Sequence, residues 1–409
     1  MRINKNSFFM SSMFWLMIIY CNTYVVWPVE FRAVLYGGVC LLIGIFFIFI
    51  NPKRKIIPLN YVFIMMTIYF LYSCLNAVIM YESIEKLVIG LYEYLFLVFL
   101  FFFCIYGYMY VSFEKIRTFL CVFGVIVSLL SICEYNMGIN FFHDRQIMAW
   151  DYYGDGLIRG TVFAASPMEC GTLICIYIFS CLERWIKTKK YIYIVSMLLG
   201  FCGLWSTHSR GPLIAFIITL VFFVSLYIFY QYGISIKRFL YVFMCFLLCI
   251  PLLVYIVNGN VALYEWLLSI KDFEYDTSNA LRLAFWLNAI NTIFYDAYNF
   301  LFGIGVASTG ALGLGTTSIT VTESGILKRW MEGGMFMMLL YYSFIFLLLR
   351  YMVKVCKSFP REGVYILSCL ICILIEDVTL QITESVNVSF MFWLLAARGF
   401  LLSKSISGR

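Results

Sequence analysis

Three arginines, Arg159, Arg210 and Arg282, stand beside apolar runs and could bind an anionic group. A guanidinium keeps its charge, and its planar set of N–H donors matches two oxygens of a phosphate at once. Three such groups on one surface could together hold a phosphate or pyrophosphate. Each arginine has an alternative role, because it could extend along apolar surface to water or pair with a carboxylate such as Asp155 or Glu274.

Two glutamates and a histidine could transfer protons or orient hydroxyl groups. Glu323, in VTESGILKRWMEGGM, could act as a general base or orient a sugar hydroxyl; the alternative is a solvated helix start with Thr322 as N-cap. Glu169 lies in an apolar run, where an ionisable group either faces a cavity or pairs, for example with an arginine. His208 and Ser209 are adjacent, and adjacency does not place a base against a nucleophile, so no catalytic triad is expected.

Metal and nucleotide sites are not indicated. The chain has two histidines and fifteen cysteines, and most of the cysteines lie inside apolar runs, where cysteine behaves as a small hydrophobe. With so few histidines and with cysteines inside apolar runs, a structural zinc site is not expected. The stretch GIGVASTG follows no strand and precedes no Lys-Ser/Thr, which argues against a nucleotide-binding loop. We therefore expect no metal and no cofactor.

The elements that position these residues are strongly apolar. Of the 409 residues, 63% are hydrophobic and 12% are charged, against about half and about a quarter in an ordinary globular protein. Apolar runs of about 17–25 residues are long enough to cross a bilayer. The pattern predicts an all-α polytopic membrane protein with about twelve transmembrane helices, and no soluble basic face suggests nucleic-acid binding. The expected spans are residues 8–27, 33–50, 59–80, 87–110, 118–136, 161–182, 192–207, 213–233, 241–258, 333–353, 364–386 and 387–403.

The distribution of lysine and arginine predicts the orientation of these spans. One set of alternate loops, which includes residues 53–55 and 184–190, carries about twice as many of these residues as the other set. Because cytoplasmic loops concentrate lysine and arginine, we expect this set and both termini in the cytoplasm. The junction that contains Arg210 then faces outward.

Three regions are expected along the chain. Residues 1–258 form a transmembrane bundle of about nine spans with an external loop at 137–160, residues 259–332 form a large external subdomain, and residues 333–409 form the C-terminal spans. In the external subdomain, LRLAFWLNAINTIFYDAY has apolar residues at helical spacing, whereas FGIGVASTGALGLGTTS is a glycine-rich loop. We expect short amphipathic helices resting on the membrane surface.

Four motifs together resemble the O-antigen ligase/polymerase superfamily of bacterial envelope proteins. STHSRGPLIAF is similar to that family's Ser-Arg-Gly junction between two spans, and RLAFWLNAINTIFYDAYNFLFGIGVAS to its Arg-x-x-x-Trp segment leading to a Gly-x-Gly turn. IRGTVFAASPMECGTLI resembles its Arg-x-x-Gly-like entry to a middle span. ESGILKRWMEGGMFMMLLYY resembles its return into the membrane through a Glu-x-Gly step. The resemblance spans residues 157–345.

The resemblance implies a helical fold of the membrane glycosyltransferase C type. It implies a Wzy-like polymerase that joins undecaprenyl-pyrophosphate-linked oligosaccharide repeat units into O-antigen or capsule, on the periplasmic face of the bacterial inner membrane. Ligases of the family carry a histidine in the external loop; counting back from Gly334, this chain has Glu323 there, which favours a polymerase over a ligase. A transporter or flippase of lipid-linked glycan is the alternative of another class, although charges gathered at the outer face favour an enzyme.

The same resemblance assigns roles to the candidate residues. Arg210, with Arg159 and Arg282, would bind the carrier phosphate and stabilise the charge that develops on the leaving pyrophosphate. Glu323 would accept the proton of the incoming sugar hydroxyl. Further contacts to substrate are expected from Glu169, His208 and Arg329. The expected partners are membrane lipid, the carrier-linked oligosaccharides and a chain-length regulator protein.

Overall fold

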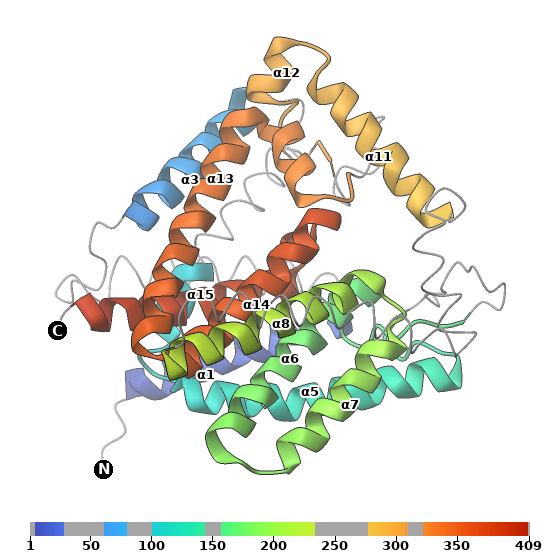
Figure 1. The fold of residues 1–409 in the computed structure, drawn as a ribbon. Coiled ribbons are helices and arrows are strands. Elements are labelled where there is room, and N and C mark those ends of the chain that lie inside the picture. Colours follow the sequence, from blue (N-terminus) through green and yellow to red (C-terminus); the bar gives the residue numbers. More distant parts are fainter. Residues whose placement is uncertain are drawn as a thin grey trace.

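The computed structural model describes residues 5–27, 61–79, 100–143, 157–233, 277–306, 308–309 and 322–407, and these residues form helices and loops without a strand (Figure 1). The α-helices are α1 (Lys5–Asn22), α3 (Tyr61–Ile79), α5 (Phe113–Met137), α6 (Pro167–Thr188), α7 (Ile192–Ser206), α8 (Arg210–Tyr232), α11 (Thr277–Ile293), α12 (Ala297–Phe302), α13 (Gly325–Ser358), α14 (Pro360–Thr379) and α15 (Val386–Ser407). Two short 3-10 helices are η1 (Tyr24–Val26) and η2 (Ile382–Glu384). The predicted all-α class is confirmed.

Several helices are suited to a lipid bilayer. Among the described residues, α5, α8, α13 and α15 are long and apolar enough to cross a membrane, and shorter apolar helical segments lie at Ser11–Asn22, Ile64–Ile79 and Ile192–Ser206. The chain is therefore consistent with a membrane protein. The predicted number of twelve spans is not established, because the spans expected at 33–50 and 241–258 and most of that at 87–110 lie outside the described residues.

Local capping explains where two of the helices begin and end. α6 begins at Pro167, and the preceding Ser166 side chain accepts a hydrogen bond from the Glu169 N–H at 3.2 Å. α14 ends at Thr379, before the predicted limit at residue 386, because Leu380 already has extended backbone. The last residues of that predicted span, from Leu380 on, therefore lie beyond α14 and include the 3-10 helix η2.

A kink at Gly334 divides α13. Gly334 has φ 70° and ψ −172°, and a Cβ atom there would collide with the Leu301 carbonyl of α12, so this close approach requires glycine. Next to the kink, the Tyr72 hydroxyl of α3 donates to the Gly333 carbonyl at 2.9 Å. α3, α12 and the first part of α13 are thereby joined, and the domain boundary expected at 332–333 falls at the kink.

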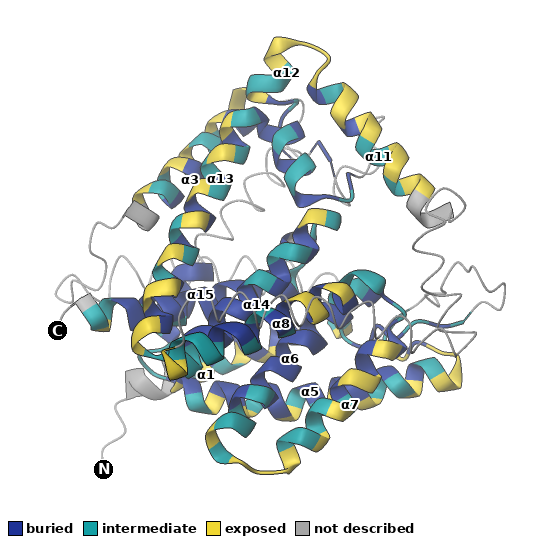
Figure 2. Cartoon of the chain, in the orientation of Figure 1, coloured by how far each residue is buried: buried dark blue, intermediate teal, exposed yellow. Residues whose placement is uncertain are grey.

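The packed centre of the molecule contains α6, α14 and α15, whereas apolar side chains on α7 and α11 point outward (Figure 2). α5 and α7 approach each other through small residues: a Cβ atom on Gly203 would lie 2.7 Å from the Ser128 Cα. The hydroxyl oxygens of Ser131 and Ser206 lie 2.7 Å apart in the same contact. Close contacts between small residues are typical of helices that associate in membranes.

Charged contacts gather at two ends of the helix bundle. We call one of them the Arg361 end; its members are Glu114, Arg117, Glu183, Arg184, Lys187, Arg361, Glu362 and Arg398. Glu183 is fully buried there, and its Oε1 lies 2.6 Å from Arg117 Nη1 and 2.8 Å from Arg361 Nε. Two guanidinium groups thus offset the desolvation of one carboxylate. The opposite end, where α5 and α7 finish and α6 and α8 begin, we call the Arg210 end.

Candidate functional site

Glu134, near the end of α5, anchors the loop that leads into the Arg210 end. Its carboxylate is fully buried and accepts hydrogen bonds from the backbone N–H groups of Thr161 at 2.7 Å, Val162 at 2.9 Å and Phe141 at 2.9 Å. The Asn140 side chain donates to the same carboxylate at 3.2 Å. Val162 has a φ of 50°, which a β-branched residue rarely adopts, and its bond to Glu134 supports that conformation.

Arg159 joins this loop to the turn between α7 and α8. Its Nε donates to the Thr207 carbonyl at 3.1 Å. Its Nη2 donates to the His208 carbonyl at 3.0 Å and to Ser209 Oγ at 2.8 Å. Three bonds from one guanidinium hold the backbone of the turn, so Arg159 fixes the segment that delivers Arg210.

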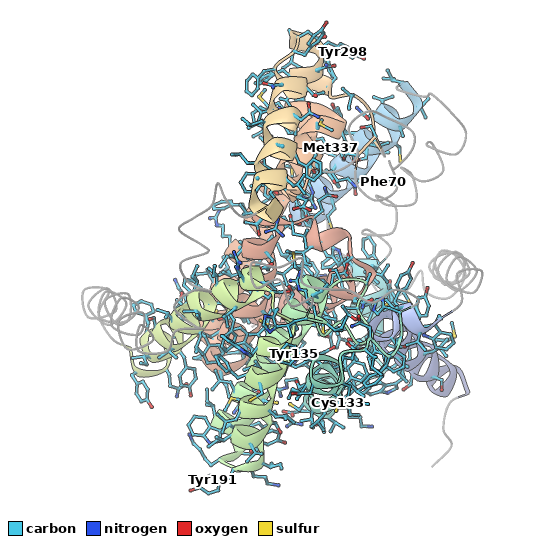
Figure 3. All side chains as sticks on the ribbon, turned by 90° about the vertical axis from the view of Figure 1, so that its right-hand side faces the viewer. Phe70, Cys133, Tyr135, Tyr191, Tyr298 and Met337 are labelled. Atoms are coloured by element: carbon cyan, nitrogen blue, oxygen red, sulfur yellow. The ribbon has the colours of Figure 1, made fainter. Side chains whose placement is uncertain are left out.

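His208 occupies the middle of that turn in a left-handed conformation, with φ 47°. Its ring stacks on Tyr135, which is labelled in Figure 3, with ring centroids 4.9 Å apart. It lines a small pocket with Trp205 and Leu213. Burial, and secondarily the charge of Arg159, lowers the pKa of His208, which favours the neutral imidazole. A neutral imidazole can hydrogen-bond a hydroxyl group but adds no charge for binding phosphate.

Arg210 begins α8 and is half-buried. The next residue, Gly211, faces the carboxylate of Glu376 on α14: a Cβ atom on Gly211 would lie 2.9 Å from Glu376 Oε2 and 3.0 Å from Oε1. The absence of a side chain therefore lets a carboxylate approach the positive N-terminal end of α8. The sequence analysis did not predict Glu376 as a residue of this site.

Arg282 on α11 forms an ion pair with Glu323. Arg282 Nε donates to Glu323 Oε2 at 2.6 Å, and Trp286 Nε1 donates to the Glu323 carbonyl at 3.2 Å. Arginine and tryptophan lie one helical turn apart, so both side chains reach the same loop. Arg282 Nη2 also lies 3.6 Å from the Met168 sulfur, at the start of α6. These contacts connect α11 to the Arg210 end.

The loop that carries Glu323 starts α13 differently from the prediction. Ser324, not Thr322, is the N-cap, and its Oγ accepts from the Leu327 N–H at 3.5 Å. Thr322 Oγ1 instead accepts a hydrogen bond from the Gln381 side chain at 2.6 Å. Glu323 has a φ of 44°, so the chain turns at this residue and the helix begins after it.

The other two predicted substrate-binding residues have protein partners. Arg329 is 3% exposed; its Nη1 lies 3.0 Å from Asp377 Oδ2, and its Nη2 donates to Thr383 Oγ1 at 2.6 Å. Glu169 accepts a hydrogen bond from the Ala165 N–H at 3.1 Å. Arg329 thus joins α13 to α14, and contact of either residue with substrate stays a prediction.

The predicted residues form two neighbouring groups at the Arg210 end. One group is Arg159, His208 and Arg210, and the other is Arg282 with Glu323. Both groups border the start of α6, because Gly171 of α6 packs against Pro212 of α8 and Met168 contacts Arg282. In the described residues, no group of three His, Cys, Asp or Glu side chains could hold a metal ion.

The fold and this site define a helical protein with membrane-spanning character and arginines gathered at one end of its bundle. A family model described as O-antigen ligase matches residues 195–342, from within α7 to the middle of α13. This match supports the predicted membership in the O-antigen ligase/polymerase superfamily. The matched segment includes Arg210, Arg282 and Glu323, whereas Arg159 and Glu376 lie outside it. No curated protein matches the chain.

Proposed function

We propose that this protein is a membrane glycosyltransferase that joins undecaprenyl-pyrophosphate-linked oligosaccharide repeat units into a surface polysaccharide. The observation that carries the proposal is the gathering of arginines from three separate segments at the start of α6. Arg159 holds the α7–α8 turn, Arg210 begins α8, and Arg282 reaches Met168 from α11. A family model for O-antigen ligases covers two of the three arginines.

In such a reaction the arginines would stabilise the negative charge that develops on the leaving pyrophosphate. When the bond between the donor sugar and its pyrophosphate breaks, the electron pair leaves with the pyrophosphate oxygen. Arg210 and Arg282 donate to that oxygen or its neighbours and stabilise the charge more strongly in the transition state than before it. Arg159 acts through the turn that it holds, and Glu323 keeps Arg282 oriented through the 2.6 Å bond.

A ligase that transfers finished glycan to a lipid or protein acceptor is the second candidate, and the description of the matching family favours it. The polymerase is preferred because the loop position expected to hold a ligase histidine holds Glu323. His208 lies instead on the α7–α8 turn, stacked on Tyr135.

The proposed setting is the bacterial inner membrane, with the Arg210 end in the periplasm and both termini in the cytoplasm. Lipid-linked repeat units are then delivered to the outer face, where the external segment around α11 and α12 holds the glycans. A chain-length regulator is the proposed protein partner, because polymer length must be limited by something that contacts the growing chain.

A gel of surface and carrier-linked glycans from cells lacking the gene tests this function. A polymerase predicts loss of the polymer ladder, with single repeat units left on the acceptor. A ligase predicts full-length polymer accumulating on the carrier. An unchanged ladder would reject both enzymes, and transport of lipid-linked glycan would be measured next.

Variants of Arg210 test the phosphate site. We expect Arg210→Ala to reduce polymer formation about a hundredfold, as for loss of one transition-state donor, and Arg210→Lys to recover only part of it because lysine lacks the bidentate geometry. Arg350→Ala, which removes an exposed arginine elsewhere on α13, is the matched control and should leave the ladder intact. Full activity of both Arg210 variants would remove this residue from the site.

A further inference from the structure

Glu376 is a buried acidic residue that faces the N-terminal end of α8 without a hydrogen bond to it. It lies at the Arg210 end of α14, its side chain is 1% exposed, and its Oε2 has no hydrogen-bond partner among the described residues. The neighbouring Asp377, equally buried, bonds to both Arg329 and Thr383. A hydrogen bond or an ion pair is found for each of the acidic side chains Glu114, Glu134, Glu169, Glu183, Asp296, Glu323, Glu332 and Glu362. Glu376 is thus the exception.

A buried carboxylate without a partner is unfavourable, because it loses its hydration and gains no compensating donor. Such groups persist where a ligand or a reaction uses them. A structural role would require donors, which Asp377 has and Glu376 lacks. The placement of Glu376 therefore indicates a use that arises when a substrate binds.

The surroundings of Glu376 indicate which substrate atoms it would meet. Its two oxygens lie against Gly211, the residue after Arg210, where the missing side chain makes room for the carboxylate. The charge of Arg282 also acts on this carboxylate. Glu376 is therefore close to the residue that follows Arg210 and within the electrostatic reach of Arg282. These are the two arginines that are proposed to hold the leaving pyrophosphate. A sugar carbon attached to that pyrophosphate would lie close to the carboxylate.

Glu323 is less suited to accept a proton in the structure as it stands. Its Oε2 already accepts a hydrogen bond from Arg282 Nε at 2.6 Å, so that oxygen is occupied by a guanidinium. Its carboxylate is also more open to water, at 25% side-chain exposure. The two glutamates thus differ in their partners. Glu323 orients an arginine, whereas Oε2 of Glu376 has no hydrogen-bond donor among the described residues and can accept a proton from a substrate.

We propose that Glu376 is the general base of the glycosyl transfer, an inference that rests on the proposed function. The Glu376 carboxylate takes the proton from the hydroxyl of the acceptor sugar. The acceptor oxygen then forms a bond to the anomeric carbon of the donor. The bond from that carbon to the pyrophosphate oxygen breaks, and its electron pair leaves with undecaprenyl pyrophosphate. One proton moves to Glu376 and later to water, so charge and atoms balance.

The test compares Glu376→Gln with Glu323→Gln in the full-length protein. Polymer formation is measured in the deletion strain, which supplies its own lipid-linked repeat units. Binding of undecaprenyl pyrophosphate is measured on the purified proteins. We expect Glu376→Gln to lose polymer formation by at least about a hundredfold, the usual contribution of a general base, while its affinity for undecaprenyl pyrophosphate changes less than about threefold. Glu323→Gln should lose activity and affinity together, since it releases Arg282.

Thermal unfolding in detergent separates a catalytic from a structural role. Glutamine has the shape of glutamate without the buried charge, so Glu376→Gln should unfold at the same or a higher temperature than the wild type. Glu376→Asp, which keeps a carboxylate, should restore part of the activity. A Glu376→Gln protein that is folded and polymerises normally would overturn the proposal. So would a Glu376→Gln protein that is inactive because it is unfolded, if a folded Glu376→Ala protein polymerises normally.

The controls distinguish failure of this inference from failure of the proposed function. If the wild type makes polymer and Arg210→Ala does not, but Glu376→Gln does, then the glycosyltransferase stands and Glu376 is not its base. If the ladder of the deletion strain equals that of the wild type, the proposed function fails and the assignment of Glu376 fails with it.

Discussion

At the scale of single residues, buried carboxylates at the Arg210 end have opposite environments. Glu134 is saturated with donors from the loop at residues 140–162, whereas Glu376 has no hydrogen-bonded partner among the described residues. The first arrangement stabilises a loop, and the second leaves a group available to a substrate. The same residue type therefore serves two purposes, decided by the number of donors that reach it.

Glu134→Ala should destabilise the protein strongly. Removal of the carboxylate leaves the buried N–H groups of Thr161 and Val162 without acceptors, at a cost of about 3 kcal/mol in the free energy of unfolding. Glu134→Gln should cost less, because the amide oxygen still accepts. Thermal unfolding in detergent measures both. Asn136→Ala, at an exposed position two residues further along α5, is the control and should leave the melting temperature unchanged. Equal melting temperatures for the wild type and Glu134→Ala would show that the loop is held by other contacts.

At the scale of helices, close approach through small residues positions the α7–α8 turn. α5 and α7 meet at Ser128 and Gly203, and this contact sets the distance between Glu134 at the end of α5 and the turn that follows α7. In a bilayer, lipid tails compete with apolar side chains, so helices gain most by packing that lipid cannot match. A seam of small residues provides such packing and also determines where Arg159 meets the turn.

Gly203→Ala should separate α5 from α7. The added Cβ atom would lie 2.7 Å from the Ser128 Cα, which is backbone and can move only with its helix. Overpacking of this kind costs about 1–3 kcal/mol, and the displaced turn should also lower polymer formation. Cys202→Ala, at the adjacent exposed position, is the control for α7. Unchanged unfolding and activity in Gly203→Ala would contradict the tight packing of this seam.

At the scale of the whole molecule, two charged ends enclose an apolar middle. The Arg361 end consists of ion pairs among protein groups, whereas the Arg210 end carries the candidate site. Alternate helices run in opposite directions between these ends, so loops at opposite ends should face opposite sides of a membrane. Figure 3 shows Tyr191 and Tyr298 at opposite extremities of the molecule.

Cysteine labelling of the full-length protein tests this orientation. Tyr191, between α6 and α7, is 81% exposed, and Tyr298, on α12, is 50% exposed. With a membrane-impermeant maleimide on intact spheroplasts, we expect Tyr298→Cys to label and Tyr191→Cys to label only after permeabilisation. The wild type, with its native cysteines, gives the background. Labelling of Tyr191→Cys from outside, with Tyr298→Cys protected, would reverse the proposed sidedness and place the Arg210 end in the cytoplasm.

Much of the site could be predicted because its residues stand out against an apolar background. Arg159, Arg210 and Arg282 are unusual neighbours for membrane spans, and the motifs around them resemble a known superfamily. Thr322 was the wrong N-cap because nothing local shows that Glu323 adopts a left-handed conformation. Glu376 was not predicted as a site residue, because the position it faces is Gly211, and a glycine has no side chain that would indicate a site.

The sequence by itself determined the all-α class, the membrane-spanning character and the superfamily, because apolar run lengths and short motifs are local properties of the chain. Tertiary structure alone decided the state of each charged group. Whether a glutamate is saturated like Glu134, paired like Glu323 or left open like Glu376 depends on donors from helices that are distant in sequence. Those donors are brought together only when the helices pack, and their number decides whether a buried charge stabilises the fold or is available for chemistry.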